Sequence, residues 1–546
     1  MKMQFILAVR VLVAVAIAIG AAGARAQTFS VLYNFGATGD PLNPSYEGII
    51  AQGRDANLYS TSPNANSSAN GTVFAITPSG TLTVLYGFID GNLPKSGLTL
   101  GTDGNFYGTT FQATSDSGEV FKVTPSGSLT VLHTFTNGND GGAPVAPPIE
   151  GTDGNFYGTT TTGGANGWGT VYKITSSGTL ATIYSFVDWA HGVDQWAPLV
   201  QGTDGDFYGV TYEGGSSGGG VAYKITASGK FTLLSNLSGI GGTVGPLVQG
   251  SDGNFYGTTF QGGANSFGTV FKMTPSGKLT VLHNFSGTDG SGPYAGLTLA
   301  NDGNFYGVTY EGGNSTNCQS GCGTIFQISP KGKLTVLYNF DMTTGMYPYV
   351  TLIQHTDGVL YGDTAEGGTN QKECTQGCGV FFSLNMGLKP FVSMVLASGK
   401  VGSNVEILGQ GLTGTKSVSF NGTAASFKVV SDTYLTATVP NGATTGSVQV
   451  TTPGATLTSN KVFRVTPQIK NFTPTSGPVG TQVTITGVSL TQTSKVTFGG
   501  VAATQFTVNS DTQVTAYVPT GAKTGHIAIT TPGGVVVSKG VFTVTQ

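Results

Sequence analysis

The stretch Asp103-Gly104-Asn105-Phe106-Tyr107-Gly108-Thr109-Thr110 decides the fold, because versions of it return at a nearly constant interval. The other copies begin at Asp153, Asp204, Asp252, Asp302 and Asp357, and a degenerate one, Asp-Ala-Asn-Leu-Tyr-Ser, begins at Asp55. Successive copies are 48, 50, 51, 48, 50 and 55 residues apart. A period near 50 made only of strand-like segments is typical of a β-propeller with one blade per repeat. The spacing therefore predicts seven blades.

Each repeat contains four segments with the alternation of a β-strand. In one repeat they are Gly97–Leu100, Asn105–Thr110, Glu119–Val123 and Leu129–Phe135, separated in part by Asp-Gly and Ser-Gly turns. Such turns join neighbouring antiparallel strands, so the four segments predict a meander. The Asp-Gly-Asn turns also resemble calcium loops, but Asp-Gly is the favoured hairpin pair and we interpret them as turns.

The two ends of the repeat region complement each other. Residues 29–35, Phe-Ser-Val-Leu-Tyr-Asn-Phe, copy the fourth strand before any first strand, and the seventh repeat stops after Val380–Leu384 without a clear fourth strand. We therefore expect the N-terminal strand to complete the last blade and close a ring, which removes two exposed strand edges. An open solenoid would not explain why the two incomplete ends match.

After Met386 the pattern changes, and two copies of a different unit follow. Residues 390–465 align with residues 467–544. Units of roughly 80 residues with about seven short strands predict immunoglobulin-like sandwiches. The predicted fold is all-β: a leader at 1–26, a seven-bladed β-propeller at 27–386, and β-sandwiches at 387–466 and 467–546.

The first 26 residues have the pattern of a secretory signal peptide. A basic start precedes the apolar run Val11–Ala22 and the small-residue site Ala24-Arg25-Ala26. The run is too short for a transmembrane anchor, and no later stretch approaches about 20 apolar residues. We expect a secreted protein (extracellular, at the outer surface or in the periplasm) with no transmembrane segment after cleavage.

Composition narrows the class of partner. Charged residues make up only 9% of the chain, and the formal net charge is −3. No basic patch favours nucleic acid. A neutral surface rich in Gly, Thr and Asn that also bears aromatic residues is common in exported proteins that meet polysaccharide.

Four cysteines stand in two equivalent places, Cys318 with Cys322 and Cys374 with Cys378. A four-thiolate zinc site would need the same residues. Because export leads to an oxidising compartment, two local disulfides are the favoured interpretation. We expect no metal and no cofactor.

The repeat resembles the GloVer tandem-repeat (choice-of-anchor) family of bacterial exported proteins, over about residues 29–385. The copy at residues 252–285 carries the full pattern: Asp-Gly-Asn-Phe-Tyr-Gly-Thr-Thr, then Gly-Gly-x-Asn, then Gly-Thr-Val-Phe-Lys-x-Thr-Pro-Ser-Gly-x-Leu-Thr-Val-Leu. The resemblance implies an exported protein with a variable surface anchor, although Val541–Gln546 has no recognisable anchor. The C-terminal pair is similar to IPT/TIG domains, on Pro474–Gly487 and Ile527–Gly533, and such modules serve as spacers or contact domains.

Three tryptophans fall on the propeller face that is expected to bind ligand, formed by the connections between blades and the loops between second and third strands. Trp168 lies in such a loop, and Trp189 and Trp196 lie in an inserted connection. Exposed tryptophan faces stack on sugar rings, and neighbouring polar side chains could bond hydroxyl groups. Alternatively, the tryptophans cover a blade junction. The candidate ligand-binding residues are Trp168, Trp189, His191, Asp194, Trp196 and Glu213.

A second candidate site is acidic. The positions nine residues after each motif aspartate should ring the upper mouth of the channel, and they hold Asn64, Gln112, Thr162, Glu213, Gln261, Glu311 and Glu366. Three carboxylates there could bind a cation or act as acid and base on a glycan. Alternatively, these glutamates are solvated or cap glycine-rich loops.

Three functions compete. The leading one is a secreted or cell-surface, non-catalytic binding or adhesion protein that recognises carbohydrate or another envelope component, with the C-terminal pair contacting other surface proteins. The alternatives are a polysaccharide lyase or glycoside hydrolase that uses Glu213, Glu311 or Glu366, and an architectural protein-interaction scaffold. Low charge and regular repeats favour the non-enzymes, because active sites gather several titratable groups.

Overall fold

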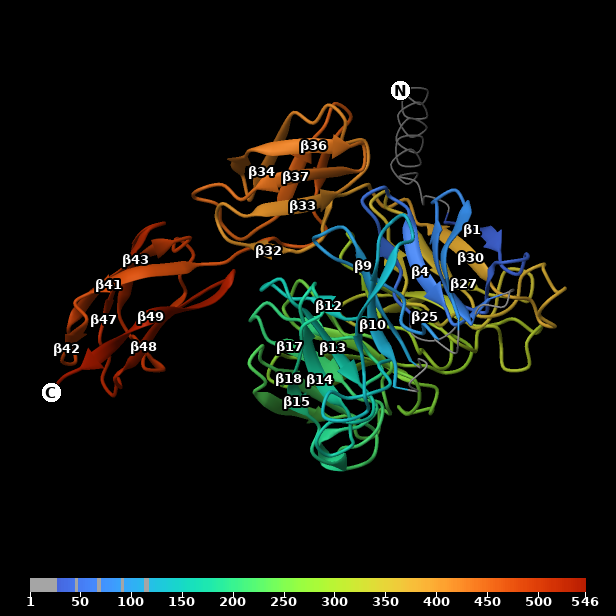
Figure 1. Cartoon of the computed structure of the whole chain (residues 1–546), viewed down its shortest axis with the longest axis horizontal. Coiled ribbons are helices and arrows are strands. Elements are labelled where there is room, and N and C mark those ends of the chain that lie inside the picture. Colours follow the sequence, from blue (N-terminus) through green and yellow to red (C-terminus); the bar gives the residue numbers. More distant parts are fainter. Residues whose placement is uncertain (1–26, 45–47, 66–69, 90–92, 112–116) are drawn as a thin grey trace, which may run out of the picture.

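The computed structural model describes residues 27–44, 48–65, 70–89, 93–111 and 117–546 (Figure 1). Within these ranges the regular structure is β-strand, apart from one short 3-10 helix, η1 (Trp189–His191). No helix of the described part is long and apolar enough to cross a membrane. The predicted leader, residues 1–26, and the candidate residue Gln112 lie outside the described residues.

Four-stranded antiparallel sheets fill the repeat region, and the described residues form seven of them. A small pair, β2 (Pro41–Leu42) and β5 (Asn64–Ala65), lies beside them. The strands of the seven sheets, inner to outer, are β3 (Ala51–Gln52), β4 (Leu58–Ser62), β6 (Gly71–Ile76), β7 (Leu82–Phe88); β8 (Thr99–Leu100), β9 (Phe106–Thr110), β10 (Glu119–Val123), β11 (Leu129–Thr134); β12 (Ile149–Glu150), β13 (Phe156–Thr160), β14 (Thr170–Ile174), β15 (Leu180–Ser185); β16 (Val200–Gln201), β17 (Phe207–Val210), β18 (Val221–Ile225), β19 (Phe231–Asn236); β20 (Val248–Gln249), β21 (Phe255–Thr259), β22 (Thr269–Met273), β23 (Leu279–Asn284); β24 (Thr298–Leu299), β25 (Phe305–Thr309), β26 (Thr324–Ile328), β27 (Leu334–Asn339); and β28 (Ile353–Gln354), β29 (Leu360–Asp363), β30 (Val380–Asn385), β1 (Thr28–Asn34).

The repeated motif builds a turn that is bonded to its own strand. The carboxylate of Asp103 accepts hydrogen bonds from the backbone N–H of Asn105 (3.0 Å) and from the Tyr107 hydroxyl (2.8 Å). Gly104 sits at φ 84°, a conformation that favours glycine. Burial alone would raise the pKa of Asp103, but these hydrogen bonds hold it below its usual value. The motif is therefore a structural element, as its Asp-Gly turn predicts.

The same tyrosine also joins one sheet to the next. The ring of Tyr107 stacks on Phe156 of the following repeat, with centroids 3.7 Å apart. The same contact recurs in the pairs Tyr59–Phe106, Tyr157–Phe207, Tyr208–Phe255 and Tyr256–Phe305. Every one of these rings is buried, so the motif supplies the core between sheets as well as the turn.

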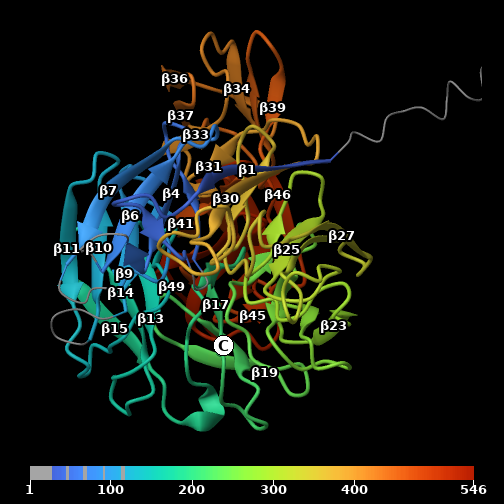
Figure 2. The ribbon, with the colours of Figure 1, turned by 90° about the vertical axis from the view of Figure 1, so that its right-hand side faces the viewer.

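A polar link accompanies the stacking on the side of the Asp-Gly turns. The second residue of an inner strand accepts a hydrogen bond from a backbone N–H in the turn of the preceding repeat, as Gln201 Oε1 does from Thr152 (3.0 Å). Gln52 Oε1 accepts the equivalent bond from Thr356 (3.0 Å), which joins the last repeat to the first. Ile49 also forms backbone bridges to both Gly97 and Thr351. The first and last sheets are therefore neighbours, and Figure 2 shows the sheets following one another around a common centre.

The N-terminal strand β1 is the outer strand of the last sheet. It pairs antiparallel with β30, from Thr28 opposite Asn385 to Asn34 opposite Val380. Phe29 stacks on Tyr338 of the preceding sheet, with centroids 3.8 Å apart. The sequence predicts this pairing of the two ends.

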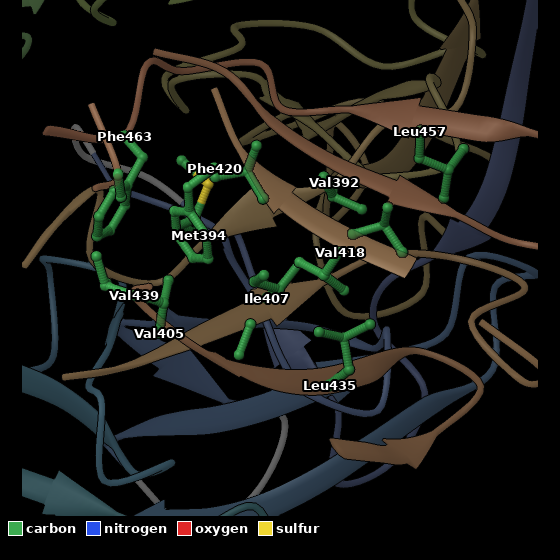
Figure 3. Close-up of a cluster of buried hydrophobic side chains, with 14 of the residues drawn as sticks. Val392, Met394, Val405, Ile407, Val418, Phe420, Leu435, Val439, Leu457 and Phe463 are labelled. Carbon is green, nitrogen blue, oxygen red and sulfur yellow. The ribbon is translucent and has the colours of Figure 1, made fainter. Parts of the chain in front are cut away.

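The two C-terminal units each consist of two main sheets around one core. Figure 3 shows the core of the first unit, where Val405, Ile407 and Leu435 of one sheet meet Val418 and Phe420 of the other. Its strands are β31 (Ser393–Met394), β33 (Asn404–Leu408), β37 (Tyr434–Thr438), β36 (Phe427–Ser431); β35 (Thr423–Ala425), β34 (Ser417–Phe420), β38 (Val448–Thr451), β39 (Thr456–Thr458); and the parallel pair β32 (Ser398–Gly399), β40 (Arg464–Val465). Those of the second unit are β41 (Gln468–Thr473), β43 (Gln482–Val488), β47 (Gln513–Tyr517), β46 (Phe506–Ser510); and β42 (Ser476–Gly477), β49 (Gly534–Val544), β48 (Gly525–Thr531), β44 (Lys495–Phe498), β45 (Val501–Ala502).

The first C-terminal unit docks on the side of the Asp-Gly turns. Arg54 Nη2 lies 2.7 Å from Glu406 Oε1, and the Arg54 guanidinium stacks over the Tyr434 ring at 4.7 Å. Further bonds run from Arg464 Nη1 to Gly202 O (3.1 Å) and from Gln410 Nε2 to Thr356 Oγ1 (3.0 Å). The other repeats have Thr, Ser or Asn at the position of Arg54. The degenerate first repeat is thus the one that carries the main docking residue.

Both cysteine pairs form disulfides, Cys318–Cys322 and Cys374–Cys378, with Cα–Cα distances of 5.3 and 5.2 Å. No free cysteine occurs among the described residues. The prediction of two local disulfides is confirmed.

Candidate functional site

The candidate residues lie on the side of the repeat region opposite the docked unit. Strand β24 ends at the turn that contains Asn301, whose Nδ2 donates to Lys389 O (2.7 Å) next to the first C-terminal unit. Tyr294 precedes the start of the same strand and so lies at its other end. We call this opposite side the connection face: it consists of the connections between sheets and the loops between second and third strands.

Trp168 and Trp189 form an exposed pair on the connection face. Their ring centroids are 6.5 Å apart at an interplanar angle of 76°. The side chains are 39% and 44% exposed, so this edge-to-face contact leaves indole faces accessible. The backbone of Trp189 is fixed, because its carbonyl accepts a hydrogen bond from the N–H of Gly215 (2.7 Å). The pair is thus a pre-formed aromatic surface.

His191 stands at the outer side of this pair. Its Nδ1 is 2.6 Å from Asp188 Oδ1, and the same carboxylate caps η1 by accepting from the His191 N–H (3.1 Å). Its ring lies 5.8 Å from Phe231 in the outer strand β19. His191 is therefore held near the rim, with one ring nitrogen engaged by Asp188.

Asp194, Trp196 and Glu213 form a separate inner group. Trp196 lies 5.8 Å from Tyr212, and Asp194 O accepts from the Tyr212 N–H (3.0 Å). The backbone of Glu213 bridges Val193. Burial, together with the charge of Glu213, raises the pKa of Asp194. The structure thus divides the six candidate residues into a rim group (Trp168, Trp189, His191) and an inner group.

A half-buried aromatic cluster on the connection face was not predicted from the sequence. Phe260 stacks on Tyr294 with centroids 4.0 Å apart, and Tyr310 stacks on Tyr347 at 4.6 Å. Tyr349 lies 4.7 Å from Tyr310 and 5.0 Å from Tyr294. The signal was present in the repeats as two aligned aromatic columns: Tyr212, Phe260 and Tyr310 follow their motif aspartates by eight residues, and Trp196, Tyr294 and Tyr349 each precede a buried leucine by three.

Glu311 and Glu366 lie beside this cluster, apart from Glu213. Burial raises the pKa of both carboxyls. Burial is the main cause that raises the pKa of Tyr310, and the negative charges of Glu311 and Glu366 raise it further. Within the described ranges, no group of three or more His, Cys, Asp or Glu side chains could hold a metal ion. One interpretation of the sequence was that Glu213, Glu311 and Glu366 together bind a cation. The described residues do not gather these three glutamates into one such site.

The geometry on the connection face suits recognition of a hydroxyl-rich ring. Indole and phenol faces offer flat apolar area, and the carboxylates of Asp194, Glu213, Glu311 and Glu366 offer hydrogen-bond acceptors.

The repeated four-stranded sheets define a β-propeller-like repeat protein, and family models agree. The Gloeobacter/Verrucomicrobia repeat matches residues 21–147, 112–319 and 238–426, and the IPT/TIG domain matches residues 390–465 and 467–544. The chain belongs to the Gloeobacter/Verrucomicrobia repeat family, with two TIG domains at its C-terminal end. A search of curated proteins found no match.

Solved structures resemble the chain at the level of fold only. A streptogramin B lyase is 15% identical, covers 66% of this chain and 97% of its own, and superposes with a TM-score of 0.45. A fungal alcohol oxidase of the AA5 family in complex with copper is 14% identical, covers 80% and 99%, and has a TM-score of 0.47. A surface glycan-binding protein from Prevotella bryantii is 21% identical, covers 27% and 38%, and has a TM-score of 0.22. These scores are too low to transfer a function.

Proposed function

We propose that this protein is a secreted or cell-surface, non-catalytic carbohydrate-binding protein. The repeat region forms a closed seven-bladed propeller that presents its connection face to the glycan, and the two TIG domains are immunoglobulin-like sandwiches that space or dock it. The observation that carries the proposal is the exposed Trp168–Trp189 pair, fixed at the rim of that face.

The physical reason is the cost of exposing indole rings without a partner. A tryptophan side chain has 150–250 Å² of surface to bury, and at about 25 cal/mol per Å² the covered part of even one indole face contributes about 1–2 kcal/mol. Two such faces beside the polar groups of Asp188 and His191 match a sugar, which has apolar faces and a hydroxyl rim. The proposed ligand-binding residues remain Trp168, Trp189, His191, Asp194, Trp196 and Glu213.

The test is retention of the mature protein on a panel of insoluble or immobilised polysaccharides. Trp189→Ala and Trp196→Ala should each weaken retention by about 5–150-fold, the effect of losing an anchoring aromatic worth about 1–3 kcal/mol. Phe267→Ala is the matched control, because Phe267 occupies the position of Trp168 in another repeat and is 40% exposed. If retention by the double tryptophan variant equals that of the wild type, the proposed site is wrong.

The same panel distinguishes a binder from an enzyme. Burial raises the pKa of both Glu311 and Glu366, which is the direction that a general acid needs, and this favours a second candidate, a polysaccharide lyase or glycoside hydrolase. Release of reducing ends or unsaturated products that disappears in Glu311→Gln or Glu366→Gln would replace the binder with the enzyme. A binder should release none.

A further inference from the structure

The aromatic cluster on the connection face is one continuous row of five rings, in the order Phe260, Tyr294, Tyr349, Tyr310 and Tyr347. Successive ring centroids are 4.0, 5.0, 4.7 and 4.6 Å apart. The rings come from the loops and connections of the last three sheets, so the row crosses from one repeat to the next. Each of the five side chains keeps part of its surface exposed. The row therefore presents ring edges and phenol hydroxyls to solvent.

Two glutamates lie at the Tyr347 end of this row. Glu311 directly follows Tyr310 in the chain, and the backbone of Glu366 bridges that of Met346, the residue before Tyr347. Burial raises the pKa of Tyr347, and Tyr310 and the negative charges of both glutamates raise it further. Both charges also act on Tyr310. Because such an effect requires nearby charges, both carboxylates lie close to this pair of stacked tyrosines.

Neither carboxylate has a partner among the described residues. No hydrogen bond or ion pair there engages the side chain of Glu311 or Glu366, and burial is what raises the pKa of each. Other partly buried glutamates of the chain are satisfied: the Glu150 carboxylate accepts two hydrogen bonds from Thr102 (2.7 and 2.6 Å), and Glu406 pairs with Arg54. A partly buried charge without a partner costs free energy, which a ligand that brings a positive charge restores.

The glutamates and the aromatic rings also occur in the same repeats. The position nine residues after the motif aspartate holds Glu in the fourth, sixth and last repeats, and Asn, Gln or Thr in the others. The same three repeats supply Trp196, Tyr294 and Tyr349, the aromatic residues that precede a buried leucine by three. A role in the repeat fold would be needed in every repeat, whereas a binding site departs from the pattern where it is built.

The ligand that fits these groups is a positively charged sugar. An ammonium group supplies three hydrogen-bond donors and a positive charge to the carboxylates, and it is attracted to aromatic rings. A neutral sugar would leave both charges unpaired, and an acidic sugar would be repelled by them. We propose that the aromatic cluster, with Glu311 and Glu366, binds a polymer of amino sugar whose amines are free and protonated. This inference rests on the proposed function and deepens it by naming the class of sugar.

The test compares two tetrasaccharides that differ only in the amine. The mature full-length protein is titrated by calorimetry with the β-1,4-linked tetramer of glucosamine and with its fully N-acetylated counterpart, which has no charge. The glucosamine tetramer should bind at least about 10-fold more tightly, because it alone can form charge-assisted hydrogen bonds with the carboxylates. Raising the salt concentration from about 0.05 to 0.5 M should weaken its binding several-fold and leave the N-acetylated tetramer unaffected.

The variants Glu311→Gln and Glu366→Gln locate the site. Each should weaken binding of the glucosamine tetramer by about 10-fold and leave binding of the N-acetylated tetramer unchanged. Both should fold, because Gln261 occupies the equivalent position of the fifth repeat. Glu373→Gln is the matched control: it removes an exposed carboxylate from the same loop as Glu366 and should change neither affinity.

The outcomes separate this inference from the proposed function. Absence of binding by the glucosamine tetramer, equal affinity for the two tetramers, wild-type affinity in the double glutamine variant, or an equal loss in Glu373→Gln overturns the amino-sugar site. Neutral polysaccharide that is still retained through the tryptophans would then leave the proposed function standing. Failure to retain any glycan overturns both.

Discussion

Removal of the N-terminal strand is the perturbation that tests ring closure most directly. Strand β1 supplies the outer edge of the last sheet, and its residues pair with the whole of β30. A truncated chain that begins at Ala37 would lose every one of these pairs. The strand β30, whose residues are mostly buried, would become an exposed hydrophobic edge.

The loss of stability on removing β1 can be worked out from its pairing with β30. Six residue pairs join the two strands, and backbone hydrogen bonds contribute about 0.5–1.5 kcal/mol each, so the lost pairing is worth about 3–9 kcal/mol. Phe29 adds about 1–3 kcal/mol through its stacking on Tyr338 and its contacts with Phe340 and Phe382. The sum is comparable to the whole stability of an ordinary domain, which is about 5–15 kcal/mol.

The assay is thermal and urea unfolding of the truncated protein, with light scattering to detect aggregation. We expect the truncated repeat region to aggregate or to melt far below the wild type, and a synthetic peptide of residues 27–36 to restore part of the loss. Phe29→Ala should cost about 1–3 kcal/mol, whereas Val131→Ala, at an exposed outer-strand position, should stay within about 0.5 kcal/mol. An unchanged melting curve for the truncated chain would refute closure by β1.

Three further variants probe the motif, a buried acid and the domain contact. Tyr107→Phe removes the hydroxyl that donates to Asp103 and should lower the free energy of unfolding by about 1–2 kcal/mol at pH 7. Because the pKa of Asp103 is lowered in the folded state, this loss of stability should shrink as the pH falls below about 4. Acid unfolding curves of the two proteins measure the difference. Asp363 is buried, and burial raises its pKa to about 8. Its folded state holds a proton that the unfolded chain releases, so the wild type should lose stability as the pH rises from about 4 to 8. Asp363→Thr, the residue of four equivalent positions, should remove this slope and raise the melting temperature at pH 8 by about 2–4 °C; a slope that persists would contradict the assignment. Glu406→Gln leaves Arg54 without its partner and should lower the free energy of unfolding by about 1–3 kcal/mol. A double-mutant cycle with Arg54→Met measures the coupling energy of the pair. If the two effects are additive, the pair does not hold the domains together.

Much of the fold could be predicted because the motif residues act locally. Asp103 and Tyr107 are four residues apart, and the Tyr107 hydroxyl donates a hydrogen bond to the Asp103 carboxylate. The conformation of each turn is therefore determined by residues within its own repeat. The pairing of β1 with β30 was also predictable, since the ends of the repeat region are visibly incomplete. The two disulfides were predicted from the spacing of the cysteines and from the expected export of the chain.

The parts that escaped prediction depend on contacts between distant residues. In the sequence, Arg54 is a departure from the repeat consensus with no evident role. The structure shows its partner, Glu406, which is 352 residues later in the chain. Tyr310 and Tyr349 are aromatic residues of different repeats whose positions must be aligned before their meeting can be expected. The candidate tryptophans lie on the predicted face, but their division into a rim group and an inner group depends on the path of the inserted connection, which no periodicity encodes.

The docking of the first C-terminal unit changes how the repeats share their stability. In linear repeat arrays each unit contacts only its neighbours, so unfolding can begin anywhere and spread. Here one domain contacts the first, fourth and last repeats at once, through Arg54, Gly202 and Thr356. Local opening at any one of these repeats would strain the contacts that this domain makes with the other two, so we expect the repeat region and this domain to unfold as one cooperative unit. The second C-terminal unit is bonded to the first mainly through Gln492 and Thr445, so calorimetry should resolve its unfolding as a separate transition.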